Sequence, residues 1–370
     1  MRTKAPFELT VILGAPDPEA AAIEGLAREC GCGVLYAAAC ATRVNPGNAY
    51  AATGTLDSSG VPTSLPVEAA FALVECDFRL PVECDARRFV ARCDHHRPRD
   101  AGYGRPPAEF LPASSLGQVI SLLAGRDLLP PGWHRSPRRL APGALDHEGG
   151  AYGRVWRVGT PKDAGRGKRE SALVPATLVL AAAADHCLAA AYAGQCPGVD
   201  PAALAAWRDA SRAAFQQRSV EAVRADREAA ERIVARAEWR PMGHAIVACN
   251  YHGGGPWYEG CGCDEPGQAP IAVADLRSLG AVPELPEAAA RLGRAVLYRL
   301  PPTPREPPGS AGKLGLLGAG EGTPTGTTPV EAFLVAARDG AVAGTPVLAD
   351  PASWGDSSRG FAGAWVRGTP

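Results

Sequence analysis

The chain has 370 residues, of which 46% are hydrophobic, and a formal net charge of -1. This length favours two domains, and the near-neutral charge argues against the strong positive field of proteins that bind long nucleic acid. No run of about 18 uncharged apolar residues is present, so we expect no membrane span. The eleven cysteines are scattered through apolar segments, which favours reduced, buried thiols in a cytoplasmic protein over a disulfide framework.

Short apolar strands alternate with helical segments in the first part of the chain. A helix is predicted over residues 19–29, and strands are predicted over 7–13, 33–38, 67–76 and 89–93. This alternation predicts an α/β fold built on a parallel sheet, because each parallel pair needs a crossover connection.

Loops and longer helices follow this sheet. We expect a loop over residues 126–171, an apolar helix over 173–192 and a long helix over 200–238. Asp200 can cap the long helix, and Pro201 suits its first turn, where a missing N–H has no cost.

The chain is therefore expected to form two domains joined by a helix. Residues 1–198 would form the parallel-sheet domain, 199–240 the linker helix and 241–370 a smaller mixed α/β domain. Within this second domain, the Pro, Gly and Thr content of residues 301–328 predicts a loop. We expect the active cleft to lie between the two domains.

Acidic and histidine residues follow two neighbouring predicted strands. Asp77 follows one strand, and Asp94, His95 and His96 follow the next. The carboxyl ends of parallel strands lie along one edge of a sheet, where ligand crevices form, so these side chains are expected to converge. Carboxylate and imidazole together suit Mn, Fe or Zn more than Ca. A metal-dependent hydrolytic site is the leading hypothesis.

Two further segments carry candidate site residues. Asp185 lies within the apolar segment 173–192, where burying a carboxylate is costly unless it binds something. We expect it to contact a metal or substrate, with a capped structural Asp as the alternative. Ser114 and Ser115 begin a helix whose free N–H groups form a candidate phosphate site.

The order of these features resembles the DHH phosphoesterase superfamily, which includes RecJ-type exonucleases, nanoRNA and cyclic-dinucleotide phosphodiesterases and family II inorganic pyrophosphatases. The resemblance rests on the following residues, in chain order: Asp77, Asp94, His95, His96, Ser114, Ser115 and Asp185. It implies a DHH-like first domain and a second, DHHA1-like domain that binds substrate.

For the metal, the resemblance implies one or two Mn²⁺ or Mg²⁺ ions, with Asp77 as the bridging ligand. The implied ligands are Asp77, His95, Asp185, Asp17 and Glu19. The family's first loop normally carries a His and two Asp, whereas this loop has Ala15 and keeps only Asp17 and Glu19 as candidate ligands.

For the substrate, the resemblance implies that His96 contacts the phosphate or a leaving oxygen and that Asp94 orients a histidine. The implied substrate contacts are Arg97, Ser114, Ser115, Ser358, Arg359 and Gly360. The implied activity is hydrolysis of a phosphodiester or phosphoanhydride in a small nucleotide or short oligonucleotide. The alternative is a catalytically lapsed or repurposed DHH-like protein that binds nucleotide, nucleic acid or a protein partner. A homodimer also stays open.

A second cluster of metal-binding residue types lies in a Gly-rich stretch of the second domain. It consists of Cys249, His252, Cys261 and Cys263. Their spacing matches no standard zinc knuckle, and the Cys-Gly-Cys sequence would force a strained chelate. We therefore expect thiols there and no structural zinc.

Overall fold

The computed structural model describes residues 7–370 with several gaps. The gaps are 47, 66–68, 78–87, 131, 134, 137–139, 151–152, 161–170, 238, 243–270, 280, 303–308, 319–328, 349–352, 357–360 and 369–370. The chain folds into two compact units. Unit 1 comprises residues 1–186 and 196–215, and unit 2 comprises 187–195 and 216–370.

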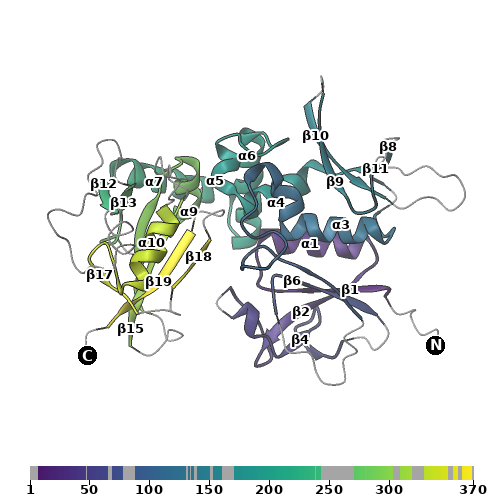
Figure 1. Cartoon of the computed structure of the whole chain (residues 1–370), viewed down its shortest axis with the longest axis horizontal. Coiled ribbons are helices and arrows are strands. Elements are labelled where there is room, and N and C mark those ends of the chain that lie inside the picture. The colour runs from purple at the N-terminus through teal and green to yellow at the C-terminus, as the bar shows by residue number, and fades with distance from the viewer. Residues whose placement is uncertain are drawn as a thin grey trace, which may run out of the picture. The chain divides into compact units, whose positions relative to one another are not determined.

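Unit 1 contains a mixed sheet with the strand order β5-β4-β2-β1-β6-β7, to which β3 adds by pairing with β2 (Figure 1). The strands are β1 (Leu9–Leu13), β2 (Gly33–Ala39), β3 (Thr42–Arg43), β4 (Gly54–Leu56), β5 (Pro62–Thr63), β6 (Ala70–Val74) and β7 (Phe89–Cys93). The accompanying helical segments are α1 (Pro18–Glu29), η1 (Ala49–Ala51), η3 (Pro107–Glu109), α2 (Phe110–Ala113), α3 (Ser115–Gly125), α4 (Ala176–His186) and α6 (Pro201–Gln216).

The four strands β2, β1, β6 and β7 run parallel, as the sequence predicts. Strands β4 and β5 are antiparallel, so the whole sheet is mixed and the prediction of a parallel sheet holds for these four strands alone. All five residues of β1 are buried. A strand that is covered on both faces has a largely apolar sequence, and this pattern is what predicted β1.

The parallel strands end in register. Leu13 lies beside Val74, and Val74 lies beside Cys93. The next residues, Gly14 and Glu75, donate their backbone N–H groups to Val74 and Cys93 at 2.9 and 3.1 Å. The chain therefore leaves β1, β6 and β7 at one edge of the sheet.

The region from 126 to 171, predicted as a loop, contains most of a second sheet with the order β8-β11-β10-β9. Its antiparallel strands are β8 (Arg135–Ser136), β9 (Leu145–Gly150), β10 (Gly153–Gly159) and β11 (Ser171–Leu173). Trp156 and Val158 alternate inward along β10 and are buried. Trp156 also stacks edge-on against Phe110, so contacts distant in sequence hold this Gly-rich segment as strand.

Each of the two predicted long helices is divided in two. The apolar segment forms α4 up to His186 and α5 (Leu188–Tyr192), with extended φ at Cys187. The 200–238 segment forms α6 and α7 (Val220–Arg236). Gln217 between them has a left-handed φ of 54°, and Ser219 caps α7 through a hydrogen bond from the N–H of Ala222.

Unit 2 is a mixed α/β unit around a sheet with the order β12-β13-β14-β15-β19-β18. Its strands are β12 (Trp239–Met242), β13 (Ile271–Asp275), β14 (Val296–Leu300), β15 (Ser310–Leu317), β16 (Ala341–Val342), β17 (Thr345–Pro346), β18 (Ser353–Asp356) and β19 (Phe361–Arg367). Besides α5 and α7, its helices include α9 (Leu285–Arg291) and α10 (Pro329–Arg338). Strand β15 corrects the prediction of a loop over 301–328, because Leu314 and Leu316 are fully buried beside Phe333 of α10.

A substitution at the sheet edge tests this strand-end packing. A Cβ atom on Gly14 would overlap the carbonyl of Glu75. We expect Gly14→Ala to lower the free energy of unfolding by about 1–3 kcal/mol, because the backbone must shift. Gly25→Ala is the matched control: its Cβ meets nothing within 4 Å, and alanine inside a helix should stabilise by up to about 1 kcal/mol. Equal urea midpoints for the two variants would contradict the packing.

Candidate metal centre

Glu19 enters the site from the first turn of α1. Asp17 caps this helix by accepting a 2.7 Å hydrogen bond from the N–H of Ala20, and Pro18 occupies the first turn. Glu19 is 2% exposed, and one carboxylate oxygen accepts a 3.0 Å hydrogen bond from the N–H of Leu116 at the start of α3. The positive end of α3 thus faces a carboxylate of the protein itself.

Glu75 enters from the end of β6. It has a left-handed φ of 52°, and its side chain is buried. A non-glycine residue in this conformation costs about 1–3 kcal/mol, and such strain persists only where the surroundings hold it. The turn ends β6 abruptly and brings Glu75, rather than Asp77, to the histidines.

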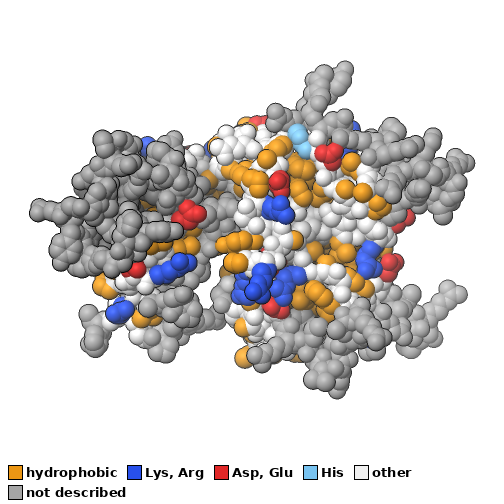
Figure 2. Space-filling view, in the orientation of Figure 1, with side chains coloured by type: hydrophobic (Ala, Val, Ile, Leu, Met, Phe, Trp, Pro, Cys, Tyr) orange, Lys and Arg blue, Asp and Glu red, His pale blue; other side chains and the backbone are white. Residues whose placement is uncertain are grey.

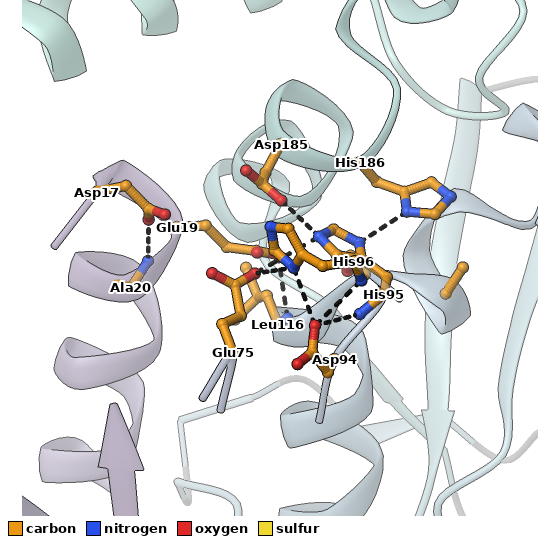
Figure 3. A network of polar contacts seen from close by, with 12 residues as sticks. Asp17, Glu19, Ala20, Glu75, Asp94, His95, His96, Leu116, Asp185 and His186 are labelled. Carbon is orange, nitrogen blue, oxygen red and sulfur yellow. Dashed lines mark hydrogen bonds and ion pairs between the residues drawn. The ribbon is translucent and has the colours of Figure 1, made fainter. Parts of the chain in front are cut away.

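His95 and Asp185 complete the cluster. Nε2 of the buried His95 lies 2.9 Å from Asp185 and 3.5 Å from Glu75. Asp185 comes from the last turn of α4, whose alanine-rich sequence allows close packing against α1. The ligand atoms of Glu19, Glu75, His95 and Asp185 all lie within 4.8 Å of one another (Figure 3).

Burial and mutual repulsion dominate the electrostatics of these carboxylates. Burial, followed by the negative charges of Asp185, Glu75 and Asp17, raises the pKa of Glu19 well above its usual value. Burial also tends to raise the pKa of Glu75, but His96 and His95 outweigh this effect, so the pKa of Glu75 is lowered. Three carboxylates this close in a buried site need a proton or a cation among them.

The donor set fits a divalent cation. Three carboxylates and one imidazole are ligands for Mn, Fe, Zn or Mg. Ligands of one ion lie up to about 4.2 Å apart, twice a bond of about 2.1 Å, so the observed separations need only slight contraction. Within the described part of the chain, Oε2 of Glu19 is buried with no hydrogen-bond partner. The cluster could therefore hold a metal ion.

Asp94 organises the histidine beside the cluster. One of its carboxylate oxygens lies 2.9 Å from Nδ1 of His96, and the same oxygen accepts the backbone N–H groups of both histidines. The Tyr50 hydroxyl donates to the carboxylate of Asp94 at 2.9 Å, and Gln118 of α3 hydrogen-bonds both backbone groups of Asp94. The resemblance implies that Asp94 orients a histidine, but it does not identify Tyr50 or Gln118.

Arg97 lies beside this network. Its guanidinium is stacked on the Tyr50 ring, 3.2 Å from the centroid. Arg97 is exposed, so a substrate can reach it. The Arg97 guanidinium therefore stacks on Tyr50, whose hydroxyl donates to Asp94, and the carboxylate of Asp94 also contacts His96.

Asp77 and Asp17 do not join the cluster, contrary to the sequence prediction. The side chain of Asp77 is 41% exposed and forms a 2.9 Å ion pair with Arg92. Asp17 lies at the other end of the first turn of α1, where it serves as the helix cap (Figure 3). Glu75 takes the place predicted for Asp77, and Glu19 is the member of the first loop that reaches the site.

Ser114 and Ser115, which the resemblance implies as substrate contacts, lie in the interior of unit 1. Both are fully buried, and the Ser114 hydroxyl caps α3 through the N–H of Gly117. The predicted contacts Ser358, Arg359 and Gly360 lie outside the described residues, as does the cysteine and histidine cluster at residues 249–263.

The thiols near these strand ends lie outside the cluster. Burial raises the pKa of Cys76 and of Cys93 to about 12. Among the described residues, the groups placed closely enough to share an ion consist of carboxylates and imidazoles alone.

No family model, curated protein or solved structure matches the chain. Among the described residues, no helix is both long enough and apolar enough to cross a membrane. The case for a function therefore rests on the geometry of the cluster.

The placement of Glu75 rather than Asp77 can be tested by metal retention. We expect Glu75→Gln to reduce bound Mn²⁺ at least about tenfold, because removal of a ligand oxygen's charge weakens the site. Asp77→Asn is the matched control and should retain wild-type metal after desalting. Elemental analysis of both proteins measures this, and the reverse pattern would restore Asp77 as the ligand.

The raised pKa of Glu19 gives the metal-free protein a defined pH dependence. Above about pH 4.5 the unfolded chain loses this proton before the folded chain does, so rising pH favours unfolding. Glu19→Gln keeps the acceptor for Leu116 and removes the charge. We expect its stability relative to wild type, measured by urea unfolding in EDTA, to increase from about pH 4 to about pH 8. A difference independent of pH would contradict the assignment.

Proposed function

We propose that the chain is a metal-dependent phosphohydrolase that cleaves a phosphodiester or phosphoanhydride bond of a small nucleotide or short oligonucleotide. The observation that carries the proposal is the buried cluster of Glu19, Glu75, His95 and Asp185. The resemblance of Asp94-His95-His96 to DHH phosphoesterases supports the choice of phosphate chemistry.

We propose one ion, Mn²⁺ or Mg²⁺, held by these four side chains. When bound, such an ion lowers the pKa of a coordinated water and neutralises charge on a phosphate. A single ion fits the described residues better than two, because Asp17 serves as a helix cap and Asp77 pairs with Arg92.

His96 is the proposed catalytic side chain. If its Nδ1 carries the proton that faces Asp94, Nε2 remains for the substrate. The side chain is 25% exposed, unlike the buried His95. A histidine fixed in this way can contact a phosphate oxygen or pass a proton to the leaving oxygen.

Arg97 is the proposed phosphate contact. A guanidinium offers several N–H donors that match phosphate oxygens. Stacking on Tyr50 already restricts the Arg97 side chain, so less conformational entropy is lost when it binds a phosphate. Arg side chains also gather on the face of unit 1 drawn in Figure 2, near the place of β6 in Figure 1. This local positive charge supports an anionic substrate despite the near-neutral chain.

A lapsed, binding-only protein is the second candidate. Ala15 and Ala21 stand in the segment where the resemblance leads us to expect ligand side chains, and the Ala15 side chain is buried and apolar. A protein with one retained ion and no turnover would fit this alternative.

Hydrolysis assays with Mn²⁺ decide between the two candidates. Dinucleotides, short oligonucleotides and pyrophosphate are the substrates to compare. The proposal predicts turnover that EDTA abolishes and that Glu75→Gln lacks. Binding of the same nucleotides without turnover, unchanged by Glu75→Gln, would favour the binding protein and contradict the hydrolase.

The role of His96 gives a kinetic prediction. We expect His96→Gln to lower kcat by about 10²–10⁴-fold, the usual contribution of a positioned acid or base. His96 also lies in a second group, with Glu75 and His95, that could hold an ion. Bound Mn²⁺ should nevertheless stay at the wild-type level, because Asp94 engages Nδ1 of His96 and the proposed ion is held by the four other side chains. Wild-type kcat, or loss of the metal together with activity, would show that His96 has a different role.

A further inference from the structure

His186 is the last residue of α4 and follows the ligand Asp185 directly. Its side chain is fully buried, like that of His95. Nδ1 of His186 lies 2.8 Å from Nδ1 of His95, and Nε2 lies 3.4 Å from the backbone oxygen of Arg105 (Figure 3 shows the contact between the two rings). One helix end therefore delivers both a ligand and a partner for another ligand.

These two contacts indicate where the protons lie. A backbone oxygen only accepts, so Nε2 of His186 must carry the hydrogen that faces Arg105. A neutral imidazole then has a lone pair on Nδ1, and His186 accepts at that atom. The proton shared between the two rings consequently belongs to Nδ1 of His95.

The remaining nitrogen of His95 is then the one that faces the cluster. Its Nε2 lies 2.9 Å from Asp185 and 3.5 Å from Glu75. The 2.9 Å contact with a carboxylate requires a hydrogen on Nε2 while no cation is present. A cation placed among these carboxylates would take the place of that hydrogen and use the lone pair of Nε2, while Nδ1 keeps its own hydrogen. In the opposite tautomer, Nε2 would carry a hydrogen and could not be a ligand.

We propose that His186 is a positioning residue for the metal centre: it accepts the Nδ1 proton of His95 and so directs the lone pair of His95 at the ion. This inference rests on the proposed metal centre and assigns it a further residue. Histidine ligands usually donate their second N–H to a carboxylate, carbonyl or water. Here a second imidazole, oriented by the oxygen of Arg105, takes that place.

A matched set of variants separates this role from packing. In His186→Asn the amide oxygen occupies the place of Nδ1 and can still accept from His95. In His186→Gln the amide group lies nearer the place of Nε2, so it can reach Arg105 but not His95. His186→Ala removes both contacts.

The full-length wild type and variants are titrated with Co²⁺, and binding is followed by visible absorption. We expect the Kd of His186→Asn to stay within about threefold of wild type, and the Kd of His186→Gln and His186→Ala to rise by about 10–100-fold. Thermal unfolding in EDTA checks that each variant is folded. If His186→Ala does not fold, the comparison of Asn with Gln carries the test alone.

Three results would overturn the inference. A folded His186→Ala with wild-type Kd would show that His186 does not act on the metal centre. Equal weakening by Asn and Gln would show that the ring fills space rather than accepts a proton. A wild type that binds no Co²⁺ would overturn the metal centre itself, and with it the proposed function.

Discussion

Two buried carboxylates and one partly buried carboxylate lie within reach of one imidazole, and this arrangement is the main constraint on unit 1. Each side chain alone would be costly to bury as an anion, and together they repel one another. Burial, followed by that repulsion, raises the pKa of Glu19. A divalent cation would offset it, and an apolar environment then becomes an advantage, because few competing waters and a low local dielectric strengthen the binding of the ion.

The fold meets this constraint by bringing the ends of several strands and helices together. Strands β1, β6 and β7 finish in register, Gly14 permits close passage of the chain past Glu75, and the left-handed turn at Glu75 points its carboxylate to the site. Helices α1 and α4 bring Glu19 and Asp185 from either end of the unit's sequence. The strain at Glu75 and the buried charge of Glu19 both lie at the centre, as expected where function rather than stability selects the residues.

The sequence predicted the sheet edge but not every residue of the cluster at it. Apolar strands identified the parallel core, and Asp94 and His95 were expected at its edge because strand ends meet there. Asp185, which lies in α4, was expected near them from its place in an apolar segment and from the resemblance. Asp77 was chosen over Glu75 because strand alternation does not reveal a left-handed turn. The sequence could not show whether Asp17 or Glu19 reaches the site, because both lie in the predicted loop after the first strand. The structure separates them, because Asp17 caps α1. Strands β9 and β10 were missed because their Gly-rich sequence resembles a loop, and only long-range contacts such as Trp156 with Phe110 hold it extended.

The most direct test of the central claim is anomalous diffraction at the manganese edge from crystals grown with Mn²⁺. The account predicts one strong peak in unit 1, about 2.2 Å from oxygens of Glu19, Glu75 and Asp185 and from Nε2 of His95. A peak beside Asp77, or no peak while His95 keeps its direct contact with Asp185, would contradict it.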